Sequence, residues 1–469
     1  MELLVLGVDG VDPEYLEKTI EERDVPGWER LKEKAFYTEL PSTVPAVTIP
    51  AWVSMFSGLN PGELDAYHLS QADFDSWELE LPSSEKFQGK FFWDHVPEKV
   101  GLHYVPGTSP AYEVNGWMRE GFPSPDDFGF YPGLEEEFGE LERENSHEYT
   151  TAKVKINAEY RNYETERRIA DRFLEEEFDV FVSVIRMTDQ VSHFAEKEEQ
   201  VIDAYEKVDG EIEKYLDRAE KEDANLLVVS DHGFLHAEKK FNITRFLEEE
   251  GYLETTGHES LLYRIAEPLL DTPLKKYLKY VHDYFQSKTG KDLSGRPNDV
   301  LSAIEKSSLV LPQHFGLGKD AVLKIHTEEM PHGTVGEDER EKILEELEEK
   351  LCSLEVSGEK VVKEVWRGEE LYGKDSMIAF RTTADYIVET APESKLYSNT
   401  STFTHDEDGV FFATGPDIDE NVQEKMSIYD VAALIYALLE EPLPEMDGEV
   451  PEKLVGKTAR EREELDIDV

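Results

Sequence analysis

The chain has 469 residues, 39% of them hydrophobic and 11% aromatic, which is enough for one large α/β domain with an insertion or for two ordinary domains. Its charge is one-sided, with 104 Asp and Glu against 49 Lys and Arg and a formal net charge of -55. A field of that sign repels nucleic acid phosphates and anionic membranes, so neither is an expected partner. It also indicates a halophilic cytoplasm, whose counter-ions would offset self-repulsion.

The single cysteine, Cys352, excludes an intramolecular disulfide and fits a reducing compartment. The N-terminus passes from Met1 and Glu2 directly into an apolar run, without a basic leader segment. The segment closest to a membrane span, Ile428 to Leu439, is interrupted and too short to cross a bilayer. We therefore expect a soluble, cytoplasmic protein with no membrane partner.

Short apolar runs alternate with segments of helical periodicity, which predicts an α/β fold with a mostly parallel sheet between helices. The clearest strands, all of a kind that suits a buried parallel sheet, are Glu2 to Val8, Asp179 to Ile185, Asn225 to Ser230 and Gly409 to Thr414. Long helices are predicted for Thr151 to Glu177 and Gln200 to Glu220. Ligands of such sheets lie at the carboxyl ends of strands, so the polar residues there are candidate site residues.

Strand signals fade into amphipathic helical sequence between Gly257 and Arg296. We predict a first part of the α/β core over residues 1–257, a helical insertion or cap over 258–310, and the remainder of the core over 311–469. Substrate contacts are expected from the insertion and from loops such as Asn115 to Asp127. The charged tail from Arg460 to Val469 is expected to fray.

Two polar residues near the N-terminus each have two interpretations. Asp9 follows the first strand, where its carboxylate can lie at the sheet edge or can cap the helix expected near Pro13. Thr48 precedes Ile49-Pro50 and a helical run, so its hydroxyl lies at a helix N-terminus. It can cap that helix, the commoner use of threonine, or act as a nucleophile assisted by the helix dipole and a nearby cation.

Metal ligands are indicated further along the chain. Asp189 and His193 stand four residues apart just past a strand, a spacing that places both on one helix face. Asp231 and His232 end another strand, and His405 lies shortly before the last one. A lone histidine is usually structural, but here three Asp and three His fall beside four strand ends. Six such ligands divide into two metal sites of three, each with open positions as catalysis requires.

The motifs together resemble type I phosphodiesterases and nucleotide pyrophosphatases of the alkaline phosphatase superfamily. They are Gly7-Val8-Asp9-Gly10, Thr48-Ile49-Pro50-Ala51-Trp52, Ser57-Gly58-Leu59-Asn60-Pro61-Gly62, Asp189 with His193, and Ser230-Asp231-His232-Gly233-Phe234. The helical run from Asp430 to Leu439 and the loop Pro442 to Gly448 resemble the closing elements of that superfamily. The resemblance spans both ends of the chain and leaves roughly residues 258 to 310 uncovered.

The resemblance implies a division of the ligands between two metals. Asp189, His193 and His405 would hold one ion, and Asp9, Asp231 and His232 the other, with Thr48 beside both. Zinc is favoured by three imidazoles over magnesium or calcium, and manganese occurs in some relatives.

Two departures from the family pattern bear on the substrate. Asp406 follows His405 where the nucleotide pyrophosphatases usually have Gly. The segment Asp65-Ala66-Tyr67-His68 offers no Asn at the place where those enzymes hold a phosphoryl oxygen. The resemblance therefore implies a phosphorylated small molecule without specifying a nucleotide.

The expected activity is hydrolysis of a phosphodiester or phosphomonoester through a phosphothreonine intermediate at a dinuclear centre. A sulfatase of the same superfamily is disfavoured because Cys352 lies far from any formylglycine motif. A phosphoglycerate-mutase-like phosphotransferase typically uses Ser where this chain has Thr48. A catalytically silent binding protein is the alternative from another class, and metal content would discriminate it.

Overall fold

The computed structural model describes residues 1–123, 129–134, 138, 141, 143–255, 301, 304–314, 317–390, 395–455 and 460–461. Most of the helical insertion predicted for residues 258–310, and most of the tail from residue 460, lie outside these ranges. The predicted domain boundaries therefore stay predictions.

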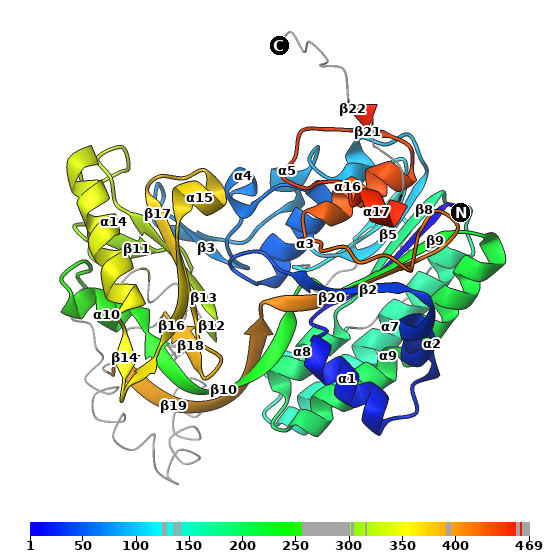
Figure 1. The fold of residues 1–469 in the computed structure, drawn as a ribbon, viewed down its shortest axis with the longest axis horizontal. Helices are drawn as coiled ribbons and strands as arrows, with labels where there is room; N and C mark the ends of the chain where they lie inside the picture. Colours follow the sequence, from blue (N-terminus) through cyan, green and yellow to red (C-terminus); the bar gives the residue numbers. More distant parts are fainter. Residues whose placement is uncertain are drawn as a thin grey trace.

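An eight-stranded sheet in the order β2-β20-β9-β1-β8-β5-β6-β7 forms the centre of the larger lobe (Figure 1). Its strands are β1 (Leu3–Val8), β2 (Phe36–Pro41), β5 (Val100–Val105), β6 (Gly116–Glu120), β7 (Phe130–Tyr131), β8 (Val180–Ile185), β9 (Asn225–Val229) and β20 (Asp408–Thr414). The neighbours β6, β5, β8, β1 and β9 are all parallel, which confirms the predicted mostly parallel sheet.

One predicted strand direction is wrong. The run from Gly409 to Thr414 forms β20, but β20 is antiparallel to β9, and β2 joins the sheet through β20 alone among the described strands. A strand buried on both faces has the same apolar pattern in either direction, so the pattern did not distinguish them. The reversal places the start of β20 at the edge where the parallel strands end.

Alternating side chains of β1 explain why both faces of the sheet are covered. Leu3 and Val5 pack into one hydrophobic core, and Leu4 and Leu6 pack into a second core on the opposite face. The second core is covered by α1 (Pro13–Glu22), α2 (Pro26–Lys34), α7 (Ala152–Leu174), α8 (Met187–Phe194) and α9 (Glu198–Glu222), and the first by α3 (Thr48–Ser57), α16 (Asp430–Leu438) and α17 (Glu452–Val455) (Figure 1). The two long predicted helices correspond to α7 and α9.

A smaller lobe is built from two four-stranded sheets around its own core. One sheet contains β12 (Leu317–Gly318), β18 (Tyr386–Glu389), β10 (Gly233–Asn242) and β19 (Tyr397–Asp406), and the other β11 (Val310–Pro312), β13 (Asp320–Ile325), β17 (Met377–Thr382) and β16 (Val362–Arg367). Helices α10 (Ile243–Glu249) and α14 (Glu337–Cys352) pack against them. Strands β10 and β19 link the lobes as one antiparallel ribbon (Figure 1).

Shorter elements connect these layers. They are α4 (Pro61–Leu64), β3 (Gln71–Asp73), β4 (Glu78–Glu80), α5 (Ser84–Phe87), β14 (Glu355–Val356), β15 (Glu359–Lys360), α15 (Gly368–Tyr372), β21 (Pro442–Leu443), β22 (Arg460–Glu461) and the 3-10 turns η1 (Phe92–Asp94) and η2 (Ser146–Glu148). In the part of the chain that is described, no helix is both long and apolar enough to cross a membrane.

Candidate metal centre

The structure brings the predicted ligands together at the edge of the eight-stranded sheet. Asp9 follows β1, and Asp231 and His232 lie between β9 and β10. His405 lies on β19 opposite Phe234 of β10. The antiparallel pair of β10 and β19 therefore places His405 next to the end of β9. Asp9 is not the cap of α1, because Asp12 occupies that position and accepts hydrogen bonds from the first turn.

Asp189, His193 and His405 form one compact group. The Oδ1 atom of Asp189 lies 3.3 Å from His193 Nε2 and 3.2 Å from His405 Nε2, and the two Nε2 atoms are 2.8 Å apart. Ligand atoms about 2.0–2.1 Å from one tetrahedral zinc ion stand roughly 3.3 Å apart. The group therefore has the spacing of three ligands that share an ion.

His232 is the centre of the second group. Its Nε2 atom lies 3.2 Å from Asp231 Oδ2, 3.7 Å from Asp9 Oδ1 and 3.4 Å from Thr48 Oγ1. Asp9, Asp189 and His232 also present ligand atoms within 4.8 Å of one another, so Asp189 adjoins both groups. The family resemblance implies that Asp189 and Asp9 hold different ions. In the structure Asp189 is close enough to contribute to either group.

Each of the three carboxylates is held by one oxygen only. Asp9 Oδ2 accepts from Trp52 Nε1 and from Arg186 Nε, while Asp189 Oδ2 accepts from Arg186 Nη2 and Gln190 Nε2. The other oxygens, Oδ1 of Asp9, Oδ1 of Asp189 and Oδ2 of Asp231, are buried and have no hydrogen-bond partner among the described residues. A buried acceptor without a donor costs free energy, and a cation would remove that cost.

The histidine rings are oriented by backbone carbonyls. Nδ1 of His232 lies 3.1 Å from the carbonyl oxygen of Gly233, and Nδ1 of His405 lies 3.0 Å from that of Ala46. An Nδ1–H donor at these positions leaves the Nε2 lone pair facing the cluster, as metal-bound histidines require. The residues present therefore fit a metal centre.

The electrostatics of the cluster also call for a cation. Burial raises the pKa of Asp9 to about 7, and burial raises the pKa of Asp231 well above its usual range. Asp189 is also buried, but His193 and His405 hold the pKa of its carboxyl well below the usual range. Burial lowers the pKa of His232 and of His405, which keeps these imidazoles neutral and able to bind a metal.

Thr48 is the first residue of α3 rather than its cap. The N-cap is Val47, which makes no side-chain capping bond, and Pro50 occupies the first turn, where a missing N–H is tolerated. The Thr48 side chain is only 4% exposed, and its hydroxyl contacts His232. The capping interpretation is therefore wrong, and the hydroxyl lies at the positive end of the helix dipole.

A pocket of about 550 Å³ lies beside the cluster and between the lobes. Its wall includes Thr48, Asp189, His193, His405, Arg186, Gln190, Phe122, Lys155, His68, His314 and Lys319. Of the loop predicted for Asn115 to Asp127, Gly116–Glu120 is strand β6, and Phe122 lines the pocket. The Arg186 guanidinium lies 3.7 Å from the centre of the Phe122 ring.

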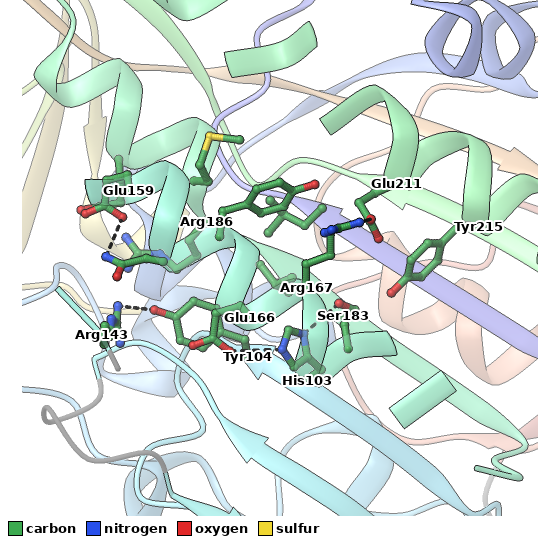
Figure 2. A pocket seen from close by; sticks show the side chains of 17 residues that line it. His103, Tyr104, Arg143, Glu159, Glu166, Arg167, Ser183, Arg186, Glu211 and Tyr215 are labelled. Carbon is green, nitrogen blue, oxygen red and sulfur yellow. Dashed lines mark hydrogen bonds and ion pairs between the residues drawn. The ribbon is translucent and has the colours of Figure 1, made fainter. Parts of the chain in front are cut away.

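A second cavity lies behind Arg186, and its volume of about 40 Å³ has room for roughly three waters rather than a substrate (Figure 2). It shares only Arg186 and Gln190 with the larger pocket. Figure 2 shows His103, Glu166 and Ser183 on its wall. No sequence pattern indicates a role for Arg186 or Gln190, although both lie in the segment that carries Asp189.

The family model for type I phosphodiesterase/nucleotide pyrophosphatase matches residues 3–402. The chain belongs to this family. The match covers every element that carries the cluster except the last few residues of β19, where His405 lies. The protein is thus a hydrolase of the phosphodiesterase and pyrophosphatase family, with candidate metal groups of Asp and His.

Solved structures agree on the fold. Murine ectonucleotide pyrophosphatase/phosphodiesterase 5 superimposes with a TM-score of 0.54 at 12% identity, over 96% of this chain and 98% of that one. The phosphonoacetate hydrolase of Sinorhizobium meliloti, in complex with phosphonoformate, gives a TM-score of 0.55 at 14% identity, over 94% and 95%. No curated protein matches the sequence.

Proposed function

We propose that the protein hydrolyses phosphoric esters of small molecules by two successive displacements, with Thr48 as the nucleophile. The observation that carries the proposal is the placement of the Thr48 hydroxyl 3.4 Å from His232 Nε2, beside three carboxylate oxygens that lack donors. The hydroxyl does not cap α3, and Thr48 lines a pocket large enough for a small substrate.

The chain's own groups define the first displacement. The Thr48 hydroxyl loses its proton to solvent as its oxygen forms a bond to phosphorus, and the ester oxygen of the leaving group departs and takes up a proton from solvent, which leaves a phosphothreonine. The N-terminus of α3 favours negative charge at that place. Water then attacks phosphorus, the Thr48 oxygen departs, and inorganic phosphate or a monoester is released.

Two divalent cations, zinc or manganese, would supply Lewis acidity and lower the pKa of the Thr48 hydroxyl. Asp189, His193 and His405 would hold one ion, and Asp9, Asp231 and His232 the other. Asp189 adjoins both groups of candidate ligands. We also propose a cytoplasmic location and a halophilic origin, in keeping with the acidic composition.

A structural relative supports the choice of threonine. One structure of murine ectonucleotide pyrophosphatase/phosphodiesterase 5 is of an inactive threonine-to-alanine variant in complex with AMP. The relative thus depends on a threonine, which agrees with a nucleophilic Thr48.

The deciding experiment uses protein loaded with zinc or manganese and assayed with bis-p-nitrophenyl phosphate, p-nitrophenyl phosphate and an aryl sulfate. We expect turnover of a phosphate ester, and acid quenching during turnover should leave phosphate on the peptide that contains Thr48. Preference for the aryl sulfate would indicate a sulfatase, and a metal-free active enzyme would contradict the mechanism.

A further inference from the structure

A pair of histidines outside the Asp/His cluster lines the same pocket as Thr48. His68 comes from the segment between α4 and β3, and His314 follows β11 in the smaller lobe. Their rings are parallel within 2°, with centroids 4.4 Å apart. Neither ring has a part in the two displacements described above.

Backbone pairing joins the two segments that carry the stacked rings. The N–H of Ala72 donates to the carbonyl of Gln313 at 3.0 Å, and Gln71 forms an antiparallel bridge with His314. These contacts tie the segment that follows His68 to the strand end that carries His314. The backbone positions from which the two rings project are therefore fixed relative to each other.

The turn that carries His68 is closed by one side chain. Gln71 Oε1 accepts from the N–H of Tyr67 at 3.1 Å, and Gln71 Nε2 donates to the carbonyl of Asp65 at 2.8 Å. His68 lies within this closed turn, so its backbone is fixed before any ligand enters. A donor that is fixed in advance needs no reorganisation when substrate binds.

The ring nitrogens of the pair have unused hydrogen-bonding capacity. Nδ1 of His68 and Nδ1 of His314 are both buried without a partner among the described residues. His314 is 3% exposed, whereas His68 is only half-buried and reaches the pocket. Burial and the neighbouring His314 lower the pKa of His68 well below its usual value, so the ring is neutral and carries one N–H. Because Nδ1 is enclosed, Nε2 is the nitrogen that can meet a bound molecule.

The geometry points to a substrate contact in which the Nε2–H of His68 donates to an oxygen of the phosphoryl group bound at Thr48. His314 is a positioning residue that holds the His68 ring by stacking. This inference rests on the proposed function, and it assigns to the stacked pair a direct part in substrate binding. A hydrogen bond to an anionic oxygen is stronger than one between neutral groups, so a single donor has a measurable effect.

The test of the contact compares His68→Phe with His68→Asn. Phenylalanine keeps an aromatic ring for the stack and lacks the donor, whereas asparagine supplies an N–H without the ring. In His68→Phe, the KM for bis-p-nitrophenyl phosphate and the dissociation constant for inorganic phosphate, measured by calorimetry, should each rise roughly tenfold or more. His68→Asn should recover part of that loss, with metal content unchanged in both variants.

The positioning role is tested at His314. His314→Ala should weaken phosphate binding, and His314→Phe should restore most of it because a ring again supports His68. His236→Phe is the matched control, since His236 lies on β10 with an exposed ring that bonds Ser401. That control should match the wild-type protein.

Wild-type phosphate affinity in a folded, metal-loaded His68→Phe variant would overturn the contact. Equal losses in His314→Phe and His314→Ala, at unchanged melting temperature, would overturn the positioning role. Failure of the wild-type protein to turn over any ester would instead contradict the proposed function, while phosphate binding would still test His68.

Discussion

His193 and His405 place their Nε2 atoms 2.8 Å apart although 212 positions separate them in the chain. His193 is presented by α8 one turn after Asp189, and His405 is carried back to the sheet by β19. The contact therefore depends on the ribbon between the lobes, and several measurable consequences follow from this arrangement and its neighbours.

Metal content should fall in a site-specific way. Wild-type protein loaded with zinc or manganese should contain close to two ions per chain by elemental analysis. His405→Ala should retain about one, because it removes one of three ligands from the group that Asp189 and His193 complete. His236→Ala, which removes an exposed histidine of the smaller lobe, should retain both ions. Two tightly held ions in His405→Ala would exclude His405 as a ligand.

Thr48→Ala should separate catalysis from stability. Loss of one buried methyl group and a hydroxyl that caps nothing should cost about 0.8 kcal/mol of unfolding free energy. Turnover should fall by several orders of magnitude with both metals bound, whereas Thr48→Ser should keep an acid-stable phosphoenzyme. Thermal melts and single-turnover kinetics measure the two effects. An alanine variant with a tenth of wild-type turnover would point to direct attack by water.

Arg186→Met should destabilise the metal-free protein strongly. Arg186 is buried and donates at 3.2 Å to Asp9 and at 3.1 Å to Asp189, so its removal leaves two buried carboxylates without that counter-charge. We expect a loss of about 3–5 kcal/mol in denaturant unfolding. The control, Arg30→Met, breaks partly exposed pairs with Asp217 and Glu220 and should cost less than about 1 kcal/mol. Similar losses in both variants would contradict the structural role of Arg186.

The negative charge of Glu166 should stabilise the fold, so the free energy of unfolding should fall when acid protonates this residue. Burial alone would raise the pKa of Glu166, but Arg119 at 2.9 Å and His103 at 3.2 Å lower it from 4.5 to about 2. A carboxylate whose folded-state pKa is lowered stabilises the fold above its unfolded pKa, and this contribution is lost as the pH falls from about 4.5 to about 2.

The matching variant is Glu166→Gln, and the measurement is unfolding free energy against pH. At pH 7 it should be less stable than the wild-type protein by on the order of 3 kcal/mol. Near pH 2 the difference between the two proteins should nearly vanish. A difference that stays constant between pH 7 and pH 2 would show that the charge of Glu166 contributes nothing.

Salt should raise the melting temperature. With a net charge of -55, acidic groups repel one another over about 30 Å in 0.01 M salt but only about 3 Å in 1 M salt. The melting temperature should therefore be higher in molar KCl than in dilute buffer. Equal melting temperatures in the two buffers would contradict the halophilic interpretation of this surface.

The sequence predicted the ligand cluster better than it predicted the surroundings. Asp9 follows β1 directly, Asp231 lies two residues after β9, and Asp189 lies in the first turn of α8, the helix that follows β8, so local patterns located them. His405 was singled out because it lies shortly before the last predicted strand, but it lies on β19 of the smaller lobe, and only the register of β10 with β19 explains its place.

Other contacts lay beyond sequence reasoning because they join distant segments. The stack of His68 on His314 depends on a backbone bridge across 243 positions, from Gln71 to His314. The direction of β20 depends on how the chain returns from the smaller lobe, which an apolar run does not encode. Arg186 is close to Asp189 in the sequence, but only its burial in the structure identifies it as part of the candidate site.

The place of β2 in the sheet has a consequence for synthesis on the ribosome. Phe36 of β2 pairs with Ala413 of β20, so among the described strands this early strand has its one partner only when the ribosome has added nearly all of the remaining chain. At about 5–20 residues per second, that interval lasts roughly 20 to 75 s. During it, both β2 and the open edge of β9 present unpaired backbone groups, the kind of surface that promotes aggregation. The order of the strands therefore leaves these two edges unpaired for most of the synthesis of the chain.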